Sequence, residues 1–403
     1  MPTLIDPSRP ILALALFRPN LDVTFKGWQG GAIYIQNLAR VLSRLEEAIR
    51  PRIIVLTDGQ INTPAIRALF SETAIDGVFG PDGSPIALKP HVYNDLIDAS
   101  GKPKPGKTAN LLSGITAAFP IFRTMLNMPQ GLHWIPDFQH KLLPEMFDGD
   151  ELARRDEDYS TIAYRREFLL LSSQSALADF RRFYPDASAK TFVWSFTSSL
   201  ETTLTPAQDP RLQFGLPEKY LFAPNQFWKH KDHRTLFEAM RLLAARGLNV
   251  TLACTGSSVD FRHPNYYADL RAFVTESGLS ERIKFLGTVL AETLIQLIRF
   301  SAAVVQPSLF EGWSTVVEDV KALGRPLFLS DLDVHKEQAV PEMPFHFFPR
   351  GNAVMLADLI QTAWSELSAG PSPNSEAFAV AAHAKRTDTS AREFLSILNV
   401  MRR

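Results

Sequence analysis

The chain has 403 residues, enough for two or three domains, and its 45% hydrophobic and 21% charged residues are typical of a globular protein. Its 42 Lys and Arg nearly balance 43 Asp and Glu, which argues against a nucleic-acid-binding protein. The single cysteine, Cys254, excludes an internal disulfide, and no early apolar run approaches the ~20 residues of a membrane span. We therefore expect a soluble, cytoplasmic protein.

Short apolar runs alternate with segments of helical periodicity along the chain. The runs are continuous, as in strands that are buried on both faces of a parallel sheet. The expected strands are Ile11–Phe17, Ile53–Thr57, Leu132–Ile135, Phe168–Ser172, Tyr220–Ala223, Asn249–Thr255, Ile283–Leu286, Ala302–Gln306 and Pro326–Ser330. Helices are expected over residues 32–46, 232–246 and 351–367, with a short terminal helix over 392–398. This order predicts an α/β fold with parallel sheets and right-handed crossovers.

Two loops in the first half have a composition that suits ligand contact. Gly30 and Gly31 stand between the first strand and the first helix, where glycine lets the backbone approach a ligand at a helix N-terminus. Residues 99–110 form a basic loop rich in Pro and Gly. That loop suits either a solvated surface or contact with an anionic acceptor or lipid headgroup, and so a peripheral membrane contact.

The stretch His133–Glu145 leaves a strand and enters a polar turn that contains Pro136. The proline argues against a regular helix through this turn. Asp137 and His140 are candidates either for ligand contacts or for capping the next helix, and His133 is expected to be structural.

The alternation of elements pauses over residues 197–218, which are polar and contain several prolines. Such a stretch is typical of a linker between domains. It divides the chain into two α/β domains of about 200 residues each.

Lys231 follows the strand at Tyr220–Ala223 and lies in the first turn of the next helix. A cation there opposes the helix dipole, so we expect a role in binding rather than in solubility alone. The neighbouring His230 and His233 lack a further ligand close in sequence, and no metal site is predicted.

Glu311 lies in the loop between the strand Ala302–Gln306 and a helix. Open α/β sheets bind ligands at this end of a strand, and helix N-termini favour phosphate. A carboxylate would repel phosphate unless it accepts hydrogen bonds from hydroxyl groups, as sugars and ribose provide. A second carboxylate, Glu318, forms a capping box with Thr315, so its role is either capping or ligand binding. The two carboxylates together suggest a sugar-nucleotide site.

These motifs resemble those of the family 4 glycosyltransferases, which are retaining, nucleotide-sugar-dependent enzymes of GT-B fold. The resemblance covers residues 215–365 and three shorter stretches of the first half. It implies two Rossmann-like domains that face each other across a cleft. The acceptor-binding domain would be residues 1–200 and the donor-binding domain residues 201–380, with a C-terminal helix, residues 381–403, that returns to the first domain.

The resemblance also implies roles for individual residues. Glu311 would contact the donor sugar and Glu318 the ribose hydroxyls, although the six residues between them are one fewer than is usual in the family. Lys231 would bind the donor diphosphate, while Asn225 occupies the position of the usual arginine and Lys229 is a candidate for the missing charge. The other implied contacts to the donor or acceptor come from Gly30, Gly31, Trp313, Ser314, Thr315, Asp137 and His140, with Phe285–Val289 beside the base.

The function implied is transfer of a hexose such as mannose, with retention of configuration. The donor would be a GDP- or UDP-linked sugar and the acceptor a saccharide or a lipid-linked saccharide in bacterial surface polysaccharide synthesis, for example of lipopolysaccharide, at the inner face of the membrane. No metal cofactor is implied, because the chain lacks a suitably placed DxD motif. The alternatives are a GT-B epimerase or phosphorylase and a non-catalytic nucleotide-sugar-binding protein. An oxidoreductase is disfavoured, because a GxGxxG fingerprint is missing.

Overall fold

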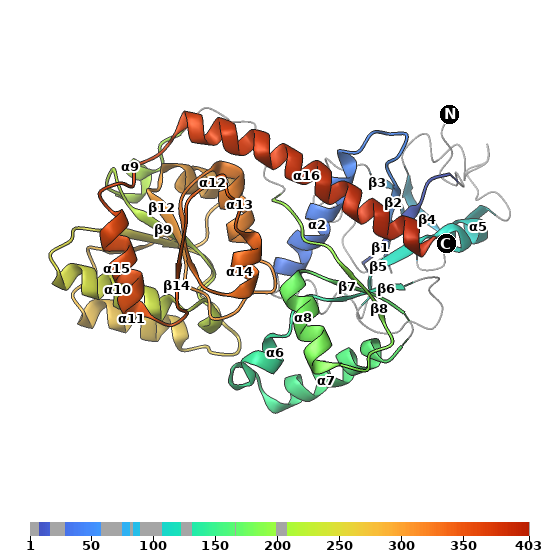
Figure 1. Ribbon diagram of the computed structural model, residues 1–403, viewed down its shortest axis with the longest axis horizontal. Coiled ribbons are helices and arrows are strands. Elements are labelled where there is room, and N and C mark those ends of the chain that lie inside the picture. The colour runs from blue at the N-terminus through green and yellow to red at the C-terminus, as the bar shows by residue number, and fades with distance from the viewer. Residues whose placement is uncertain are drawn as a thin grey trace. The chain divides into compact units, whose positions relative to one another are not determined.

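The computed structural model describes residues 8–16, 29–57, 75–80, 84–88, 107–121, 131–165, 167–198 and 208–402. The chain divides into two compact units (Figure 1). The first comprises Met1–Phe138, Ala153–Ser199 and Lys385–Arg403, and the second comprises Gln139–Leu152 and Leu200–Ala384. The sequence does not indicate that residues 139–152 group with the second unit.

In its described part, the first unit is built on an eight-stranded sheet with the order β4-β3-β2-β1-β5-β6-β7-β8. Neighbouring strands are parallel, except that β3 and β4 pair antiparallel at one edge. The strands are β1 (Ile11–Ala15), β2 (Arg52–Leu56), β3 (Ile75–Phe79), β4 (Pro85–Leu88), β5 (Ala117–Ile121), β6 (Gly131–Ile135), β7 (Phe168–Leu171) and β8 (Lys190–Val193). The central strands are buried on both faces, which explains their continuous apolar sequence.

Helices cover both faces of this first sheet. Tyr34 of α2 (Gln29–Ser43) stacks on Trp134, and Phe394 of α16 (Pro373–Met401) packs against Trp194. Side chains alternate across each strand, so Ile135 points to the opposite face from Trp134 and joins a second cluster. The helices α5 (Lys107–Gly114), α7 (Gly149–Ala163) and α8 (Gln174–Phe183) pack on that opposite face.

The second unit is built, in its described residues, on a six-stranded sheet with the order β11-β10-β9-β12-β13-β14. All of its strand pairs are parallel. The strands are β9 (Leu221–Pro224), β10 (Leu252–Thr255), β11 (Ile283–Phe285), β12 (Ala303–Gln306), β13 (Leu327–Ser330) and β14 (Phe345–Phe348). All four residues of β12 are buried, as expected for a central strand.

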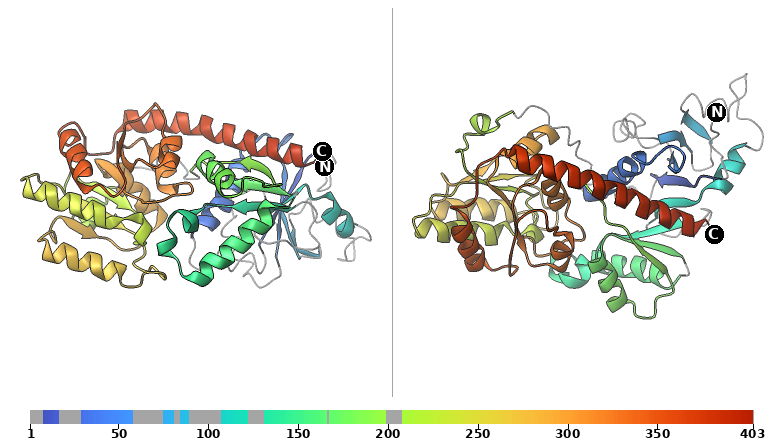
Figure 2. Two further views of the ribbon diagram at one scale, coloured as in Figure 1. Left: turned by 60° about the horizontal axis from the view of Figure 1, so that its bottom comes forward. Right: turned by 45° about the horizontal axis from the view of Figure 1, so that its top comes forward.

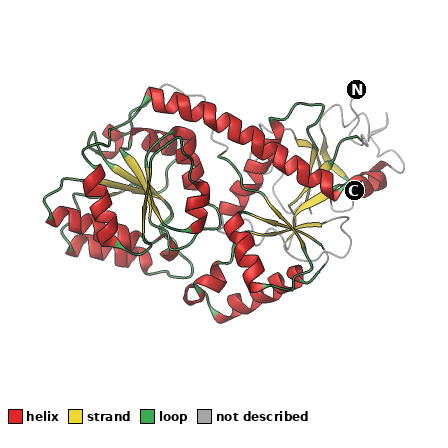
Figure 3. Cartoon of the chain, in the orientation of Figure 1, coloured by secondary structure: helices red, strands yellow, loops and turns green. Residues whose placement is uncertain are grey.

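Two layers of helices enclose the second sheet (Figures 1 and 3). One layer contains α10 (His233–Ala245), α11 (Tyr266–Glu276) and α15 (Ala353–Ala363), and the other contains α12 (Ala291–Phe300), α13 (Thr315–Leu323) and α14 (Asp333–Gln338). Leu221 packs into the first layer and its neighbour Phe222 into the second. Short segments complete the unit: α6 (Gln139–Leu142), η1 (Pro144–Met146), α9 (Arg211–Phe214) and η2 (Lys229–Lys231).

The strands and the three internal helices expected from the sequence are confirmed, with ends that differ by a few residues. The expectation of a short terminal helix is wrong, because α16 runs continuously for 29 residues (Figure 2). Its buried residues include Glu376, His383, Thr387 and Ser390, so an apolar pattern does not mark its first turns.

Some sequence predictions fall outside the described residues. They are the loop before Gln29, residues 99–106 of the basic loop, and residues 199–207 of the predicted linker. Lys107 and the residues that follow it belong to α5. No helix in the described ranges has both the length and the apolar character needed to cross a bilayer.

Candidate active site

The winding of the second sheet reverses between β9 and β12. From β9 the chain proceeds to β10 and β11 on one side and then places β12, β13 and β14 on the other. At such a switch point the loops after the two central strands diverge, and the crevice outside their carboxyl ends commonly binds ligands. Lys231 follows β9 and Glu311 follows β12, so the fold brings these two predicted site residues together.

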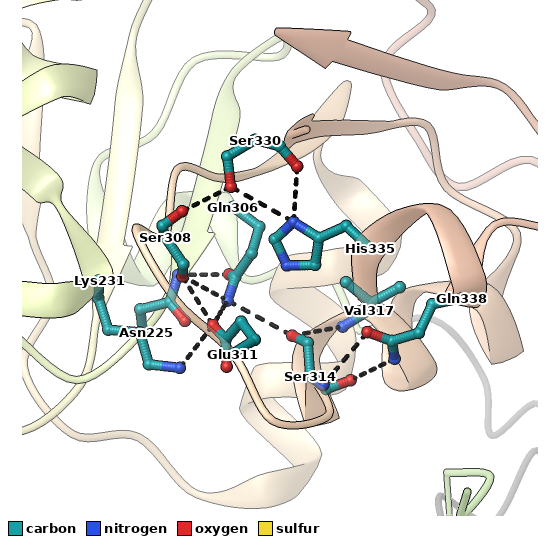
Figure 4. Close-up of polar contacts among 10 residues, drawn as sticks. All are labelled: Asn225, Lys231, Gln306, Ser308, Glu311, Ser314, Val317, Ser330, His335 and Gln338. Atoms are coloured by element: carbon teal, nitrogen blue, oxygen red, sulfur yellow. Dashed lines mark hydrogen bonds and ion pairs between the residues drawn. The ribbon is translucent and has the colours of Figure 1, made fainter. Parts of the chain in front are cut away.

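Lys231 lies at the end of η2, and its side chain points to Glu311 (Figure 4). Its Nζ donates a hydrogen bond to Glu311 Oε1 at 2.7 Å. The next residue, Asp232, has a φ of 49° and caps α10, because its carboxylate accepts a hydrogen bond from the Thr235 N–H. The Lys231 side chain is 20% exposed, and an ammonium group has three N–H donors, so it can bind a second anionic group without leaving Glu311.

Three donors converge on one oxygen of Glu311. Lys231 Nζ, Gln306 Nε2 and Ser308 Oγ each lie 2.7 Å from Oε1. Burial alone would raise the pKa of Glu311, but the Lys231 charge and the hydrogen bonds from Lys231 and Ser308 outweigh it and lower that pKa to about 2. Within the described residues Oε2 accepts no hydrogen bond, so an ionised carboxylate with one open acceptor atom stands at the switch point.

Asn225 and Gln306 form the layer beneath this carboxylate. Asn225 is 3% exposed and its Nδ2 donates to Gln306 Oε1 at 2.6 Å, while Gln306 Nε2 donates to Glu311. Asn225 therefore supports the site from below and is not directed outward as the predicted donor contact. The sequence analysis did not select Gln306 or Ser308, although a buried glutamine that ends an apolar strand is a signal for such a role.

The N-terminus of α13 differs from the predicted capping box. Ser314, not Thr315, is the cap, and its side chain accepts a hydrogen bond from the Val317 N–H. Thr315 is the first helical residue, so Glu318 cannot complete the box. Glu318 is instead 2% exposed, and its Oε1 accepts hydrogen bonds from Lys321 Nζ at 2.7 Å and Gln338 Nε2 at 3.0 Å.

The short helix α14 supports the loops after β12 and β13. The His335 Nδ1–H donates to the Ser330 carbonyl at 2.8 Å, and Ser330 Oγ donates to the Ser308 carbonyl at 2.6 Å. Burial lowers the pKa of His335, which keeps its imidazole neutral beneath the site. At the end of α14, Gln338 bonds to the backbone of Ser314.

The remaining candidates of the second unit differ in their exposure. Trp313 and Thr315 are half-buried at the start of α13. The Lys229 side chain is exposed, and its backbone N–H donates to Asp260 Oδ2 at 2.9 Å. His140 is buried in α6, where its ring lies 6.4 Å from that of Phe147, and it belongs to the same compact unit.

Three candidates belong to the first unit. Gly30 and Gly31 lie in the first turn of α2 rather than in a preceding loop, which still places them at a helix N-terminus. Asp137 is half-buried directly after β6. The nearby His133 is buried and pairs with Glu167, as its predicted structural role requires.

The histidines after β9 are packing residues. His233 is buried and stacks on Phe227, with ring centroids 4.4 Å apart. Burial, with a smaller effect of the Lys231 charge, lowers the pKa of both His230 and His233 to about 3, so both are neutral at physiological pH. Among the residues that the structure describes, no group of three or more His, Cys, Asp or Glu side chains could hold a metal.

Gly256, which follows β10, holds the loop that carries Asn225. Its φ is +135°, and a Cβ atom there would lie 2.2 Å from the Asn225 carbonyl oxygen. A Gly256→Ala variant should lose about 3 kcal/mol of unfolding free energy, because backbone would have to move. Gly278→Ala, at φ +67° with open space around it, should lose only about 1 kcal/mol. Equal losses in urea unfolding would contradict this close contact.

The sequence from 205 to 369 matches the family described as glycosyl transferases, group 1. No curated protein matches the chain. Solved structures similar to it include HepE from Anabaena in complex with UDP, at 18% identity and a TM-score of 0.63, with 97% of this chain and 100% of that chain covered.

Two further structures are similar over their whole length. Sucrose-phosphate synthase from Thermosynechococcus elongatus is 18% identical with a TM-score of 0.61, covering 97% of this chain and 95% of that one. WaaG, a glycosyltransferase involved in lipopolysaccharide biosynthesis, is 12% identical with a TM-score of 0.58, covering 96% and 99%. These likenesses confirm the predicted GT-B fold.

Proposed function

We propose that the chain is a glycosyltransferase whose Lys231–Glu311 pair binds the nucleotide-sugar donor, because residues 205–369 match the glycosyl transferases group 1 family and the chain has the GT-B fold. The observation that carries this proposal is the arrangement at the switch point of the second sheet. An ammonium group with N–H donors to spare lies 2.7 Å from a carboxylate that keeps one acceptor oxygen open. The ammonium group suits a diphosphate, and the open carboxylate oxygen suits a sugar hydroxyl.

In the proposed mechanism, Lys231 neutralises the charge that develops on the departing diphosphate. Glu311 Oε2 accepts a hydrogen bond from a donor hydroxyl and so orients the sugar. The anomeric carbon–oxygen bond to the diphosphate breaks while a bond to the acceptor oxygen forms on the same face, with retention of configuration. The acceptor proton passes to the leaving phosphate oxygen.

The donor class is proposed from two sources. The group 1 family match supports a nucleotide sugar, and HepE was solved with UDP, which favours a UDP-linked hexose over a GDP-linked one such as GDP-mannose. The acceptor is proposed to be a saccharide or a lipid-linked saccharide of the bacterial surface. WaaG, whose structure is similar, is involved in lipopolysaccharide biosynthesis.

A panel of UDP- and GDP-sugars tests the proposal. The intact protein should release free UDP or GDP from at least one donor, faster with saccharide or lipid-linked acceptors present. An epimerised sugar without nucleotide release would instead indicate an epimerase. If none of the donors is bound or turned over, the proposal is wrong.

Turnover should not require a divalent metal, because Lys231 provides the charge that Mg²⁺ would otherwise supply to the diphosphate. We expect the rate of nucleotide release to be unchanged when EDTA is added to protein that was purified without metal. Loss of activity with EDTA, restored by Mg²⁺ or Mn²⁺, would show that the leaving group is stabilised by a metal instead.

A further inference from the structure

Gln338 ends α14, and Figure 4 shows its amide directed at the first turn of α13. Its side chain is 1% exposed. A buried primary amide must find partners for its oxygen and its nitrogen, and each partner that it selects is held in a defined orientation. The partners of Gln338 belong to the loop and helix that follow Glu311.

The amide makes three hydrogen bonds. Oε1 accepts from the Ser314 N–H at 3.2 Å, and Nε2 donates to the Ser314 carbonyl at 3.0 Å. Nε2 also donates to Glu318 Oε1 at 3.0 Å. One side chain thus binds both backbone groups of the α13 cap and the carboxylate one turn later. It also occupies the Ser314 N–H, which is then not available to a donor phosphate.

The hydrogen bond from Gln338 is directed at Oε1 of Glu318 and leaves the other oxygen of that carboxylate open. Lys321 Nζ also donates to Oε1, at 2.7 Å. With both donors on Oε1, Oε2 accepts no hydrogen bond within the described part of the chain. Glu311 shows the same division, with three donors on one oxygen and none on the other. Both carboxylates of the site are therefore anchored through one oxygen and open at the other.

We infer that Gln338 is a positioning residue, which holds the Glu318 carboxylate so that Oε2 accepts a hydroxyl of the donor's ribose. The inference rests on the proposed function. Lys321 supplies charge but sets the direction of the bond less strictly, because an ammonium group has three N–H donors that turn about the Cε–Nζ bond, whereas an amide is planar. The planar amide is fixed by its two bonds to Ser314 and so determines the angle at which Nε2 meets Glu318.

The test is a double-mutant cycle of Gln338→Met and Glu318→Gln, read out by calorimetric binding of UDP and GDP and of their 2′,3′-dideoxy forms. Methionine keeps the length of the side chain but removes all three hydrogen bonds. Gln338→Met should weaken binding of the ribose nucleotide roughly tenfold. It should have little effect on the dideoxy form, and no further effect in the Glu318→Gln background.

Two additional variants control for a loss of binding that is caused by misfolding alone. Gln338→Glu keeps the acceptor for the Ser314 N–H but places a second carboxylate beside Glu318, so it should weaken ribose binding at least as much. Gln361→Met removes a surface amide on α15 that accepts a hydrogen bond from Arg246, and should leave binding unchanged.

The outcomes separate the two proposals. If the wild type binds neither UDP nor GDP, the proposed function fails and this inference fails with it. If the wild type binds but Gln338→Met weakens ribose and dideoxy nucleotides equally, or weakens neither, only the positioning role is wrong. Additive effects of the two substitutions would likewise show that Gln338 does not act through Glu318.

Discussion

A Lys231→Met variant should release nucleoside diphosphate from the donor about a hundredfold more slowly than the wild type. A fall in rate of this size is typical when one preorganised group that stabilises the charge developing in the transition state is removed. Because Glu311 keeps its hydrogen bonds from Gln306 and Ser308, the carboxylate should remain in place. Thermal stability should also fall, because the Lys231 charge is the main favourable partner of ionised Glu311, so kcat is compared at a temperature where both proteins are folded.

Lys284→Met is the matched control for this experiment. Lys284 is a partly exposed lysine of β11 that pairs with Glu281. This variant should turn over donor like the wild type. If Lys231→Met and Lys284→Met were equally active, Lys231 would not stabilise the leaving group, and the ion pair with Glu311 would be structural.

The second large effect is expected from Glu311→Gln, which removes the charge and keeps the shape. Donor turnover should fall by at least about tenfold, because the amide binds a sugar hydroxyl less strongly than a carboxylate and no longer aligns Lys231. Glu311→Ala should be more severe, since it also removes the shortest of the acceptors of the buried Gln306 amide and leaves only the longer bonds to Ser308 and Ser314.

The pH dependence of the unfolding free energy provides an independent measurement on Glu311. The pKa of Glu311 is about 2 in the folded protein, against an ordinary 4.5, so its ionised form contributes stability above pH 4.5 that is lost as the pH falls toward 2. At pH 7 the wild type should exceed Glu311→Gln by about 2–3 kcal/mol in urea unfolding, and this gap should narrow below pH 4.5. Glu281→Gln, whose side chain is 94% exposed, is the matched control and should unfold at the same urea concentration as the wild type at pH 7.

The main elements of the fold could be predicted because buried parallel strands carry a continuous apolar signature. Val304 and Val305 lie in such a strand, and Gln306, the last residue of that strand, is the first residue of the site. The order of the strands is not visible in the same way. That β9 lies beside β12 depends on how whole βα units pack, so the contact between Lys231 and Glu311 had to come from the structure.

Residues that act through distant partners were missed for a related reason. Gln338 lies 20 positions beyond Glu318, at the end of a six-residue helix, and no local pattern marks it. The predicted cap of α13 was one residue too late, because Ser314 and Thr315 are both good capping residues and the sequence does not show where the helical backbone begins. The extent of α16 was missed because polar residues occupy much of its buried side.

Hydrogen exchange of the intact protein with and without UDP or GDP tests the central claim most directly, since it reports where the nucleotide binds. If the donor site lies at the switch point between β9 and β12, amides of residues 225–232 and 308–318 should exchange more slowly in the presence of nucleotide. The protection should be lost in Lys231→Met. Nucleotide binding with protection confined to other segments would contradict the assignment of this site.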